Sequence, residues 1–190
     1  MSFKKGLIEV YTGNGKGKTT ASIGLAIRAA GYGNKILIVH FMKSKKYGES
    51  NIINEIKNID EIYLGKPYFV TKNPEIKKLF PDVVLFEPGN PPREYVELIE
   101  NGLKDTENKM ISGEYDMIIL DELITAIHFE LIDIKKVLEF LDKKPENVEV
   151  VMTGRYAPKE IIDKADLVTE MVEVKHPYQK GIEAREGIEY

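Results

Sequence analysis

Residues 12–20, which read TGNGKGKTT, constrain the fold of this chain more than any other stretch. A β-rich apolar run over residues 7–11 precedes them, and residues 21–30 follow with apolar side chains at helical spacing. Glycines let a backbone turn its N–H groups inward, and the N-terminus of a helix adds positive partial charge beside them. The sequence therefore predicts a strand, a phosphate-binding loop and a helix, with a nucleoside triphosphate as the ligand.

The loop departs at one position from the usual pattern G-x-x-x-x-G-K-[ST], because Thr12 stands where that pattern has glycine. A glycine-rich turn before a helix with solvated lysines is the alternative interpretation, and the buried strand and extra glycines count against it. We expect Lys18 to reach the terminal phosphates and the Thr19 hydroxyl to bind magnesium. The residues expected to surround the phosphates are Gly13, Asn14, Gly15, Lys16, Gly17, Lys18, Thr19 and Thr20.

Composition sets limits on the class of protein. A chain of 190 residues with 43% hydrophobic content can bury a substantial core, so we expect a single domain over residues 1–190. The formal net charge of −4 makes duplex nucleic acid a poor partner. The absence of cysteine excludes disulfides, thiolate metal sites and a cysteine nucleophile. No apolar run reaches membrane-spanning length and no signal peptide is evident, so we expect a cytoplasmic protein.

Strand-like and helical patterns alternate along most of the chain. Strands are expected at residues 7–11, 35–41, 61–64, 117–120, 148–152 and 167–174. Helices are expected at residues 19–31, 51–58, 95–111, 124–130, 134–143 and 158–164. Several strands are continuously apolar, which is typical of strands covered on both faces. The pattern predicts an α/β fold that is P-loop NTPase-like (RecA-like), with a mostly parallel sheet and helices on both faces. The functional loops should lie at the carboxyl edge of this sheet.

Two segments do not fit this alternation. Residues 71–92 are punctuated by prolines around a short apolar run at residues 83–86, which indicates a flap or an insertion. Residues 175–190 are rich in charged and aromatic side chains without a clear period, and a disordered tail is the default expectation for such an end.

The run MIIL at residues 117–120 ends in Asp121 and Glu122, the form of a strand end that binds magnesium. The alternative is that Asp121 caps the next helix, with Glu122 in its first turn. The phosphate loop upstream favours the metal site, with Thr19, Asp121 and Glu122 as its protein ligands.

Other polar or aromatic side chains follow predicted strands and should reach the same edge. Arg155 follows the strand at 148–152 and could meet a phosphate with its planar fork, unless it is a surface arginine after a turn. Lys43 follows the second strand in a loop that could equally be a solvated basic loop. His176, in the aromatic tail, is the histidine best placed to touch a ligand. Tyr68 and Phe69 follow the third strand and could pack under a planar ligand or in the core.

Taken together, these segments resemble the P-loop class of cob(I)alamin adenosyltransferases, also called ATP:corrinoid adenosyltransferases. The resemblance runs nearly end to end, and the tail that closes in GIEY is its most discriminating part. Thr12 in the first-glycine position is the family's own variant, and the resemblance also argues against a disordered tail. The matching segments are residues 11–21, 40–43, 48–49, 120–123, 153–155, 161–173 and 174–190.

The resemblance implies that cobalt(I) of a reduced corrinoid attacks the 5′ carbon of ATP and that triphosphate leaves in one piece. No side-chain acid or base is needed, so Lys18 and Arg155 are expected to stabilise the leaving group. Lys43, Glu49 and His176 are expected to contribute to the ATP site. ATP is thus the co-substrate and magnesium the cofactor, with manganese as a substitute. The resemblance also implies a homodimer and an electron donor such as a reduced flavoprotein, with no nucleic-acid or membrane partner.

A second task implied by the resemblance is removal of the lower axial ligand of the corrinoid, which makes cobalt easier to reduce. Tyr68 and Phe69 are the candidates to press against that face, on a weak local match. Some family members carry an N-terminal arm over the active site, whereas few residues precede the first strand here. Residues 73–89 are therefore a candidate lid.

Two other functions share the same phosphate loop and carboxylates. A P-loop ATPase or small-molecule kinase would transfer the γ-phosphoryl group and leave ADP, whereas adenosyl transfer leaves triphosphate. A nucleotide-switched module acting on nucleic acid would need a basic stripe, which the acidic balance of the chain does not favour.

Overall fold

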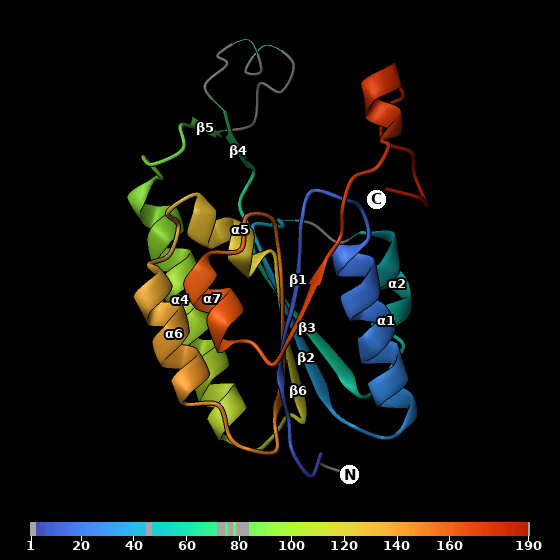
Figure 1. Ribbon diagram of the computed structural model, residues 1–190, viewed down its shortest axis with the longest axis vertical. Helices are drawn as coiled ribbons and strands as arrows, with labels where there is room; N and C mark the ends of the chain where they lie inside the picture. Colours follow the sequence, from blue (N-terminus) through green and yellow to red (C-terminus); the bar gives the residue numbers. More distant parts are fainter. Residues whose placement is uncertain (1–2, 45–46, 72–74, 76–77, 79–83, 190) are drawn as a thin grey trace.

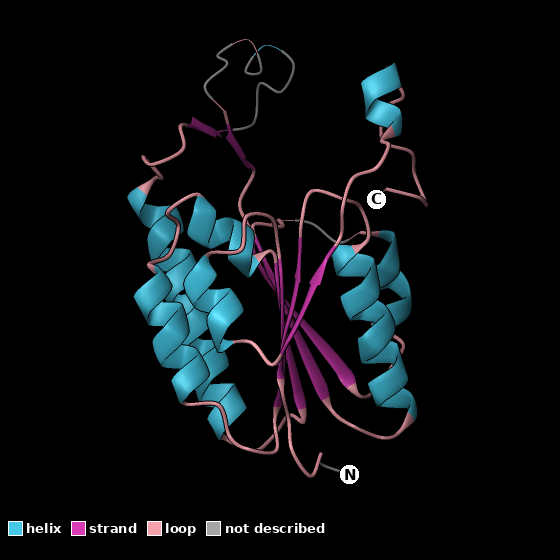
Figure 2. Cartoon of the chain, in the orientation of Figure 1, coloured by secondary structure: helices cyan, strands magenta, loops and turns pink. Residues whose placement is uncertain are grey.

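A computed structural model describes residues 3–44, 47–71, 75, 78 and 84–189 of the chain. A six-stranded sheet runs through the centre, and all of its strand pairs are parallel (Figures 1 and 2). In spatial order its strands are β3 (Ile59–Leu64), β2 (Ile36–Phe41), β6 (Met117–Asp121), β7 (Glu149–Thr153), β1 (Ile8–Thr12) and β8 (Leu167–Glu170). The parallel α/β fold predicted from the alternating pattern is confirmed.

Helices cover both faces of this sheet, as Figures 1 and 2 show. One face carries α1 (Lys18–Gly31) and α2 (Gly48–Ile53). The other face carries α4 (Arg93–Ile111), α5 (Leu123–His128), α6 (Ile134–Asp142) and α7 (Lys159–Lys164). Among the residues described, no helix combines the length and the apolar character needed to span a membrane.

The central strands explain why the apolar runs are continuous. Every residue of β2, β6 and β7 is buried, because helices press on both faces. The core accordingly divides into two clusters, one on each side of the sheet. Ile23, Ile38 and Ile119 belong to the cluster under α1 and α2, whereas Leu120 and Ile124 belong to the other.

The last strand is shorter than predicted. β8 ends at Glu170, where its pairing with β1 also ends, opposite Thr12. Beyond it Met171 leaves the sheet to bond with the phosphate loop, and a single turn of 3₁₀ helix, η1 (Pro177–Lys180), forms in the tail. Helix α2 begins and ends earlier than the helix predicted at residues 51–58, and it buries Ser50 and Ile53.

A small second sheet was not predicted. β4 (Tyr68–Val70) pairs in parallel with β5 (Val84–Phe86), and Figure 1 shows the pair standing beyond the carboxyl edge of the main sheet. Each strand has only 3 residues, too few for a periodic signal. The flap or insertion expected at residues 71–92 thus contains β5. Most of the candidate lid at residues 73–89 lies outside the described residues, so that expectation stays a prediction.

Candidate active site

The phosphate loop connects β1 to α1 at the carboxyl edge of the sheet and is held against the start of the tail. Gly15 N donates to Met171 O at 2.7 Å, and Met171 N donates to Thr12 O at 2.8 Å. Gly13 has φ +98°, and a Cβ there would lie 2.5 Å from Met171 O, so only glycine fits. Gly17 precedes α1 with φ +113°. Thr12, by contrast, is buried as the last residue of β1 and needs no such freedom.

Lys18 opens α1 and lies along the loop. Its Nζ donates to Gly13 O at 2.8 Å and to Gly15 O at 2.7 Å. Burial lowers the pKa of Lys18, with Glu122 and Asp121 opposing that shift and Arg155 adding to it. The ammonium is therefore partly desolvated and available to an anion that enters the loop.

Asp121 ends β6 and is the centre of a hydrogen-bond cluster. Its Oδ1 accepts from Thr19 Oγ1 and from Thr153 Oγ1, both at 2.8 Å. Its Oδ2 accepts from Lys43 Nζ at 2.6 Å and lies 3.0 Å from His40 Nδ1. Burial raises the pKa of Asp121, but His40 and Lys43 outweigh it and hold the pKa well below its usual range. The ionised carboxylate therefore fixes the Thr19 hydroxyl at the mouth of the loop.

Glu122 follows Asp121 in a conformation that side chains seldom adopt. Its φ is +61°, and Met42 and Tyr156, shortly after β2 and β7, share this left-handed region. Glu122 N donates to Thr153 Oγ1 at 3.0 Å, and its carboxylate accepts from Thr125 Oγ1 at 2.6 Å. Such backbone strain concentrates at functional sites, and here it turns the Glu122 side chain toward the pocket beside the loop.

His40 belongs to this cluster, although sequence reasoning gave it no role. Its Nε2 lies 2.9 Å from Glu61 Oε1, and its ring stacks on Tyr63 with centroids 4.6 Å apart. Burial lowers the pKa of His40, but the hydrogen bonds to Asp121 and Glu61 outweigh it and raise the pKa above 6.5. A histidine in an apolar strand carries no pattern that reveals its partners. Only its position next to Lys43 in a segment that resembles the family could have drawn attention to it.

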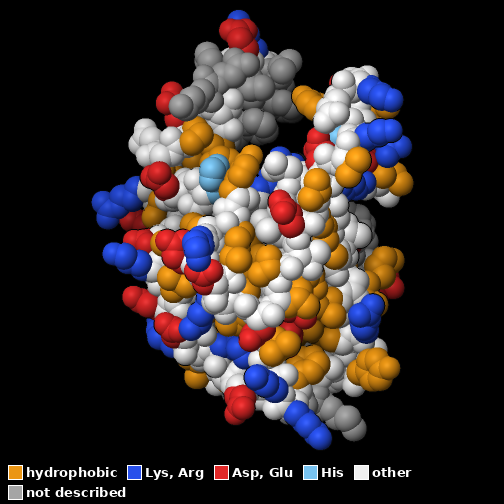
Figure 3. Space-filling view, in the orientation of Figure 1, with side chains coloured by type: hydrophobic (Ala, Val, Ile, Leu, Met, Phe, Trp, Pro, Cys, Tyr) orange, Lys and Arg blue, Asp and Glu red, His pale blue; other side chains and the backbone are white. Residues whose placement is uncertain are grey.

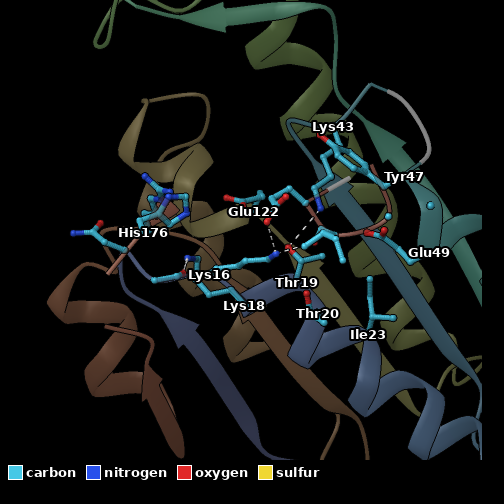
Figure 4. Close-up of a pocket in the computed structure, with 18 residues that line it drawn as sticks. Lys16, Lys18, Thr19, Thr20, Ile23, Lys43, Tyr47, Glu49, Glu122 and His176 are labelled. Carbon is cyan, nitrogen blue, oxygen red and sulfur yellow. Dashed lines mark hydrogen bonds and ion pairs between the residues drawn. The ribbon is translucent and has the colours of Figure 1, made fainter. Parts of the chain in front are cut away.

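A cavity of about 700 Å³ lies between the loop, α2, Arg155 and the tail (Figure 4). Figure 4 shows Lys18, Thr19, Lys43 and Glu122 pointing toward one another across it. The predicted residues that line it are Asn14, Gly15, Lys16, Gly17, Lys18, Thr19, Thr20, Lys43, Glu49, Glu122, Arg155 and His176. Gly13 and Asp121 lie behind this lining, where Gly13 accepts from Lys18 and Asp121 from Thr19 and Lys43.

The end of the tail forms a wall of the cavity that the sequence did not predict. Gly187, Ile188 and Glu189 line it. Lys16 Nζ donates to Ile188 O at 2.8 Å and to Glu189 Oε1 at 2.9 Å, and Arg185 also pairs with Glu189. Hydrogen bonds from Arg185 and Lys16 lower the pKa of Glu189 to about 2. The signal was present, because these residues belong to the GIEY ending, but no residue pattern indicates which element such a tail touches.

Tyr68, one of the two predicted corrinoid-side residues, is not part of the lining of this cavity. Tyr68 on β4 packs edge-on against Tyr95, with centroids 5.0 Å apart, and against Phe86 at 6.4 Å. Its hydroxyl donates to Glu94. Tyr68 is half-buried and packs against the edge of the core, and its role toward a planar ligand stays a prediction. Phe69 lies on the same strand, and its side chain is outside the described part of the structure. In Figure 3 the surface is hollowed at this edge beside the tail.

The donors that face the cavity suit a hard cation. The Thr19 hydroxyl and the Glu122 carboxylate offer oxygen atoms beside the loop, which is the donor type that Mg²⁺ prefers. The described residues contain no group of three or more His, Cys, Asp or Glu side chains that could hold a metal on their own. The arrangement therefore fits a cation shared between the protein and bound phosphates.

A glycine-rich loop between a strand and a helix, with a lysine and a threonine–aspartate pair at the carboxyl edge of a parallel sheet, defines a P-loop nucleotide-binding protein. The flagellar accessory protein FlaH from Methanocaldococcus jannaschii has a similar fold, with a TM-score of 0.51 and 14% identity over 88% of this chain and 72% of FlaH. The family model for the ATP:corrinoid adenosyltransferases BtuR/CobO/CobP matches residues 4–190. The chain belongs to this family, as its sequence indicated.

Relatives of known name agree with this assignment. A corrinoid adenosyltransferase of Sinorhizobium sp. is 34% identical over 98% of this chain and 81% of the relative. The corrinoid adenosyltransferase of Escherichia coli K12 is 32% identical over 98% of this chain and 87% of the relative. Corrinoid adenosyltransferase CobA of Salmonella typhimurium is 30% identical over the same shares of the two chains.

Proposed function

We propose that this protein transfers the 5′-deoxyadenosyl group of ATP to cobalt(I) of a corrinoid and releases triphosphate. Family membership supports this activity, and the observation that carries it to these residues is the single cavity that joins the phosphate loop to Lys43, Glu122 and Arg155. Cobalt supplies the electron pair for the new cobalt–carbon bond. The bond between the 5′ carbon and oxygen breaks, and its electron pair leaves on the triphosphate.

The protein's part in this proposal is to bind and orient. Lys18 and the loop N–H groups meet the triphosphate, and Arg155 adds a planar cation at the other wall of the cavity. The charge that develops on the leaving oxygen then meets donors already in place, which lowers the barrier without a proton transfer. Because Lys18 is held by two loop carbonyls, its ammonium is positioned before the nucleotide arrives.

Magnesium, or manganese in its place, is part of the proposal as the cation that offsets phosphate charge when ATP is bound. Thr19 and Glu122 face the cavity and would hold it. Direct coordination by Asp121 stays a prediction, since both of its oxygens already accept hydrogen bonds from protein groups. Asp121 would otherwise act through the Thr19 hydroxyl that it orients.

The proposal also covers the partners. An electron donor such as a reduced flavoprotein would supply cobalt(I), and Tyr68 and Phe69 would press on the lower face of the corrinoid. The proposal further includes that the protein acts as a homodimer in the cytoplasm. The edge strand β8 supports the dimer, because Leu167 and Val168 are 41% and 39% exposed there and the outer edge is unpaired in the described chain.

The test is anaerobic incubation with ATP, magnesium and chemically reduced cobalamin, followed by absorption spectroscopy before and after illumination. The expected result is a light-sensitive organocobalt product that requires all three components. Omission of the reductant is the control, since cobalt(II) lacks the nucleophilic electron pair. Consumption of ATP without any organocobalt product would reject the proposal and favour an ATPase or kinase.

A further inference from the structure

A continuous line of polar contacts crosses the sheet beneath the cavity, from α1 to α2. It starts where Thr19 donates to Asp121 and continues through His40 to Glu61, over distances of 2.8, 3.0 and 2.9 Å. Ser50 Oγ of α2 then donates to Glu61 Oε1 at 3.4 Å. The line therefore joins the first turn of α1 to α2, and the beginnings of these two helices form walls of the cavity (Figure 4).

The strand register explains why these side chains meet. His40 on β2 pairs directly with Asp121 on β6 and with Tyr63 on β3. Glu61 lies two residues before Tyr63, so its side chain is on the same face of the strand. This is the face that α1 and α2 cover, above the apolar cluster that contains Ile38 and Ile119. The polar line thus occupies the last layer of that face before the carboxyl edge.

Burial makes this arrangement costly if its only purpose is to hold the fold. The side chains of His40, Glu61 and Asp121 are 2%, 3% and 0% exposed. Glu61 Oε2 is buried and accepts no hydrogen bond from the described residues. Apolar side chains of similar size commonly stabilise a core as well as or better than a buried ionic group. The polar line ends at Thr19, which faces the cavity. A role in positioning Asp121 and the Thr19 hydroxyl for a ligand explains its burial better.

We propose that His40 is a positioning residue for ATP and its cation, acting through Asp121 and anchored on its far side by Glu61. His40 holds the Asp121 carboxylate in the plane that lets Oδ1 accept from Thr19 while Oδ2 accepts from Lys43. This inference deepens the proposed function by assigning residues to the nucleotide end of the site, and it rests on that function only for the turnover readout.

Loss of the imidazole leaves Asp121 with Lys43 as its main restraint on the Oδ2 side. The carboxylate then keeps Thr153 on Oδ1 but can rotate with the flexible lysine on Oδ2, so the acceptor of the Thr19 hydroxyl is no longer held in one plane. The nucleotide end of the reaction should suffer, whereas the corrinoid end should not. Removal of groups that orient ligands in this indirect way typically lowers affinity or activity by about 10- to 100-fold.

The test compares His40→Leu with His40→Asn, whose side-chain amide nitrogen takes the place of Nδ1 and can still donate to Asp121. Calorimetry measures binding of ATP in the presence of magnesium, without any corrinoid, and steady-state kinetics measure KM for ATP and for cobalamin. We expect His40→Leu to weaken ATP binding about tenfold or more and leave the cobalamin KM unchanged. His40→Asn should recover most of the binding. Thr106→Val is the matched control, because Thr106 is a buried hydroxyl in α4 that bonds only Gly102 O among the described contacts.

A second variant guards against misfolding of the first. His40→Leu/Glu61→Leu removes the buried carboxylate together with the imidazole. Its free energy of unfolding should therefore be at least that of His40→Leu, and its ATP binding should be equally weak. Wild-type binding by either leucine variant would overturn the proposal, as would equal losses in His40→Asn and His40→Leu. A comparable loss in Thr106→Val would also overturn it. Absence of organocobalt product in the wild type would instead reject the proposed function, and the binding data would still decide the role of His40.

Discussion

The two ends of the central sheet each hold a buried carboxylate and a lysine that donates to backbone carbonyls, and the surroundings of these groups differ between the ends. At the carboxyl end, Asp121 is 0% exposed and Lys18 bonds the carbonyls of the phosphate loop. At the amino end, Glu149 is 8% exposed and Lys144 bonds the carbonyls of Gly6, Pro145 and Val148. Burial lowers the pKa of both lysines.

The carboxylates differ in what surrounds them. Burial acts to raise the pKa of both, but His40 and Lys43 reverse the shift for Asp121. Glu149 accepts from Leu7 N at 2.8 Å, and neighbouring Glu9 adds to burial in raising its pKa to about 7. The charge of the ionised Asp121 carboxylate is therefore balanced by His40 and Lys43. The charge of an ionised Glu149 is poorly balanced by its surroundings. This fold thus concentrates its cations where phosphates would bind, and the lysine at its other end caps backbone carbonyls.

The largest effect on turnover should come from replacing Lys18. Lys18→Met removes the ammonium that would meet the triphosphate, so we expect kcat/KM for ATP to fall about a hundredfold. Lys144→Met is the matched control at the amino end, where the same change should reduce the free energy of unfolding and leave kcat/KM intact. Steady-state adenosylation and urea unfolding of both variants measure this. Similar turnover in the two variants would refute the claim that only the lysine at the carboxyl end acts on the triphosphate.

A smaller loss should follow Asp121→Asn, and it should appear in both turnover and stability. The amide loses the charge that holds Lys43 and His40, so we expect turnover to fall about tenfold and the free energy of unfolding to fall by about 2 kcal/mol. The lowered pKa of Asp121 also means that its stabilising contribution is present near neutral pH and is lost as the pH falls below about 4. The variant should therefore show a weaker loss of stability in acid than the wild type, and an unchanged acid profile would contradict this.

The smallest effect is expected from Glu149→Gln, with the opposite sign. Because the pKa of Glu149 is raised, the stability tied to its protonated form is present at pH 4 and is lost as the pH rises through about 7. The amide oxygen keeps the bond from Leu7 without the charge. Unfolding by urea should show a gain of about 1 kcal/mol at pH 8 and almost none at pH 4. Turnover should stay at the wild-type level, and an equal change at both pH values would refute the electrostatic explanation.

The sequence predicted the features that depend on local pattern. Buried parallel strands produce continuous apolar runs, and the glycine, lysine and threonine spacing of the loop is itself the phosphate site. The carboxyl-edge rule then placed Lys43, Glu122 and Arg155 near the loop, where all three line one cavity. Asp121 follows the same rule, one hydrogen bond behind the cavity wall.

Features that depend on neighbours distant in sequence were not predicted. His40 meets Asp121 and Glu61 because the sheet order is β3-β2-β6, which no local pattern specifies. The contact between Lys16 and Glu189 joins positions separated by 173 residues. β4 and β5 are too short to show a hydrophobic period, and each strand forms by pairing with the other. The resemblance of the tail to the family pointed to the importance of the GIEY ending without indicating what it touches.

The central claim is that the phosphate loop holds a leaving group while the chemistry occurs at the ribose end of ATP. Phosphorus NMR of a single-turnover reaction with ATP, magnesium and reduced cobalamin tests it most directly, because the products differ in their phosphorus signals. We expect intact triphosphate in an amount equal to the organocobalt product. ADP with inorganic phosphate, or a phosphorylated corrinoid, would contradict it.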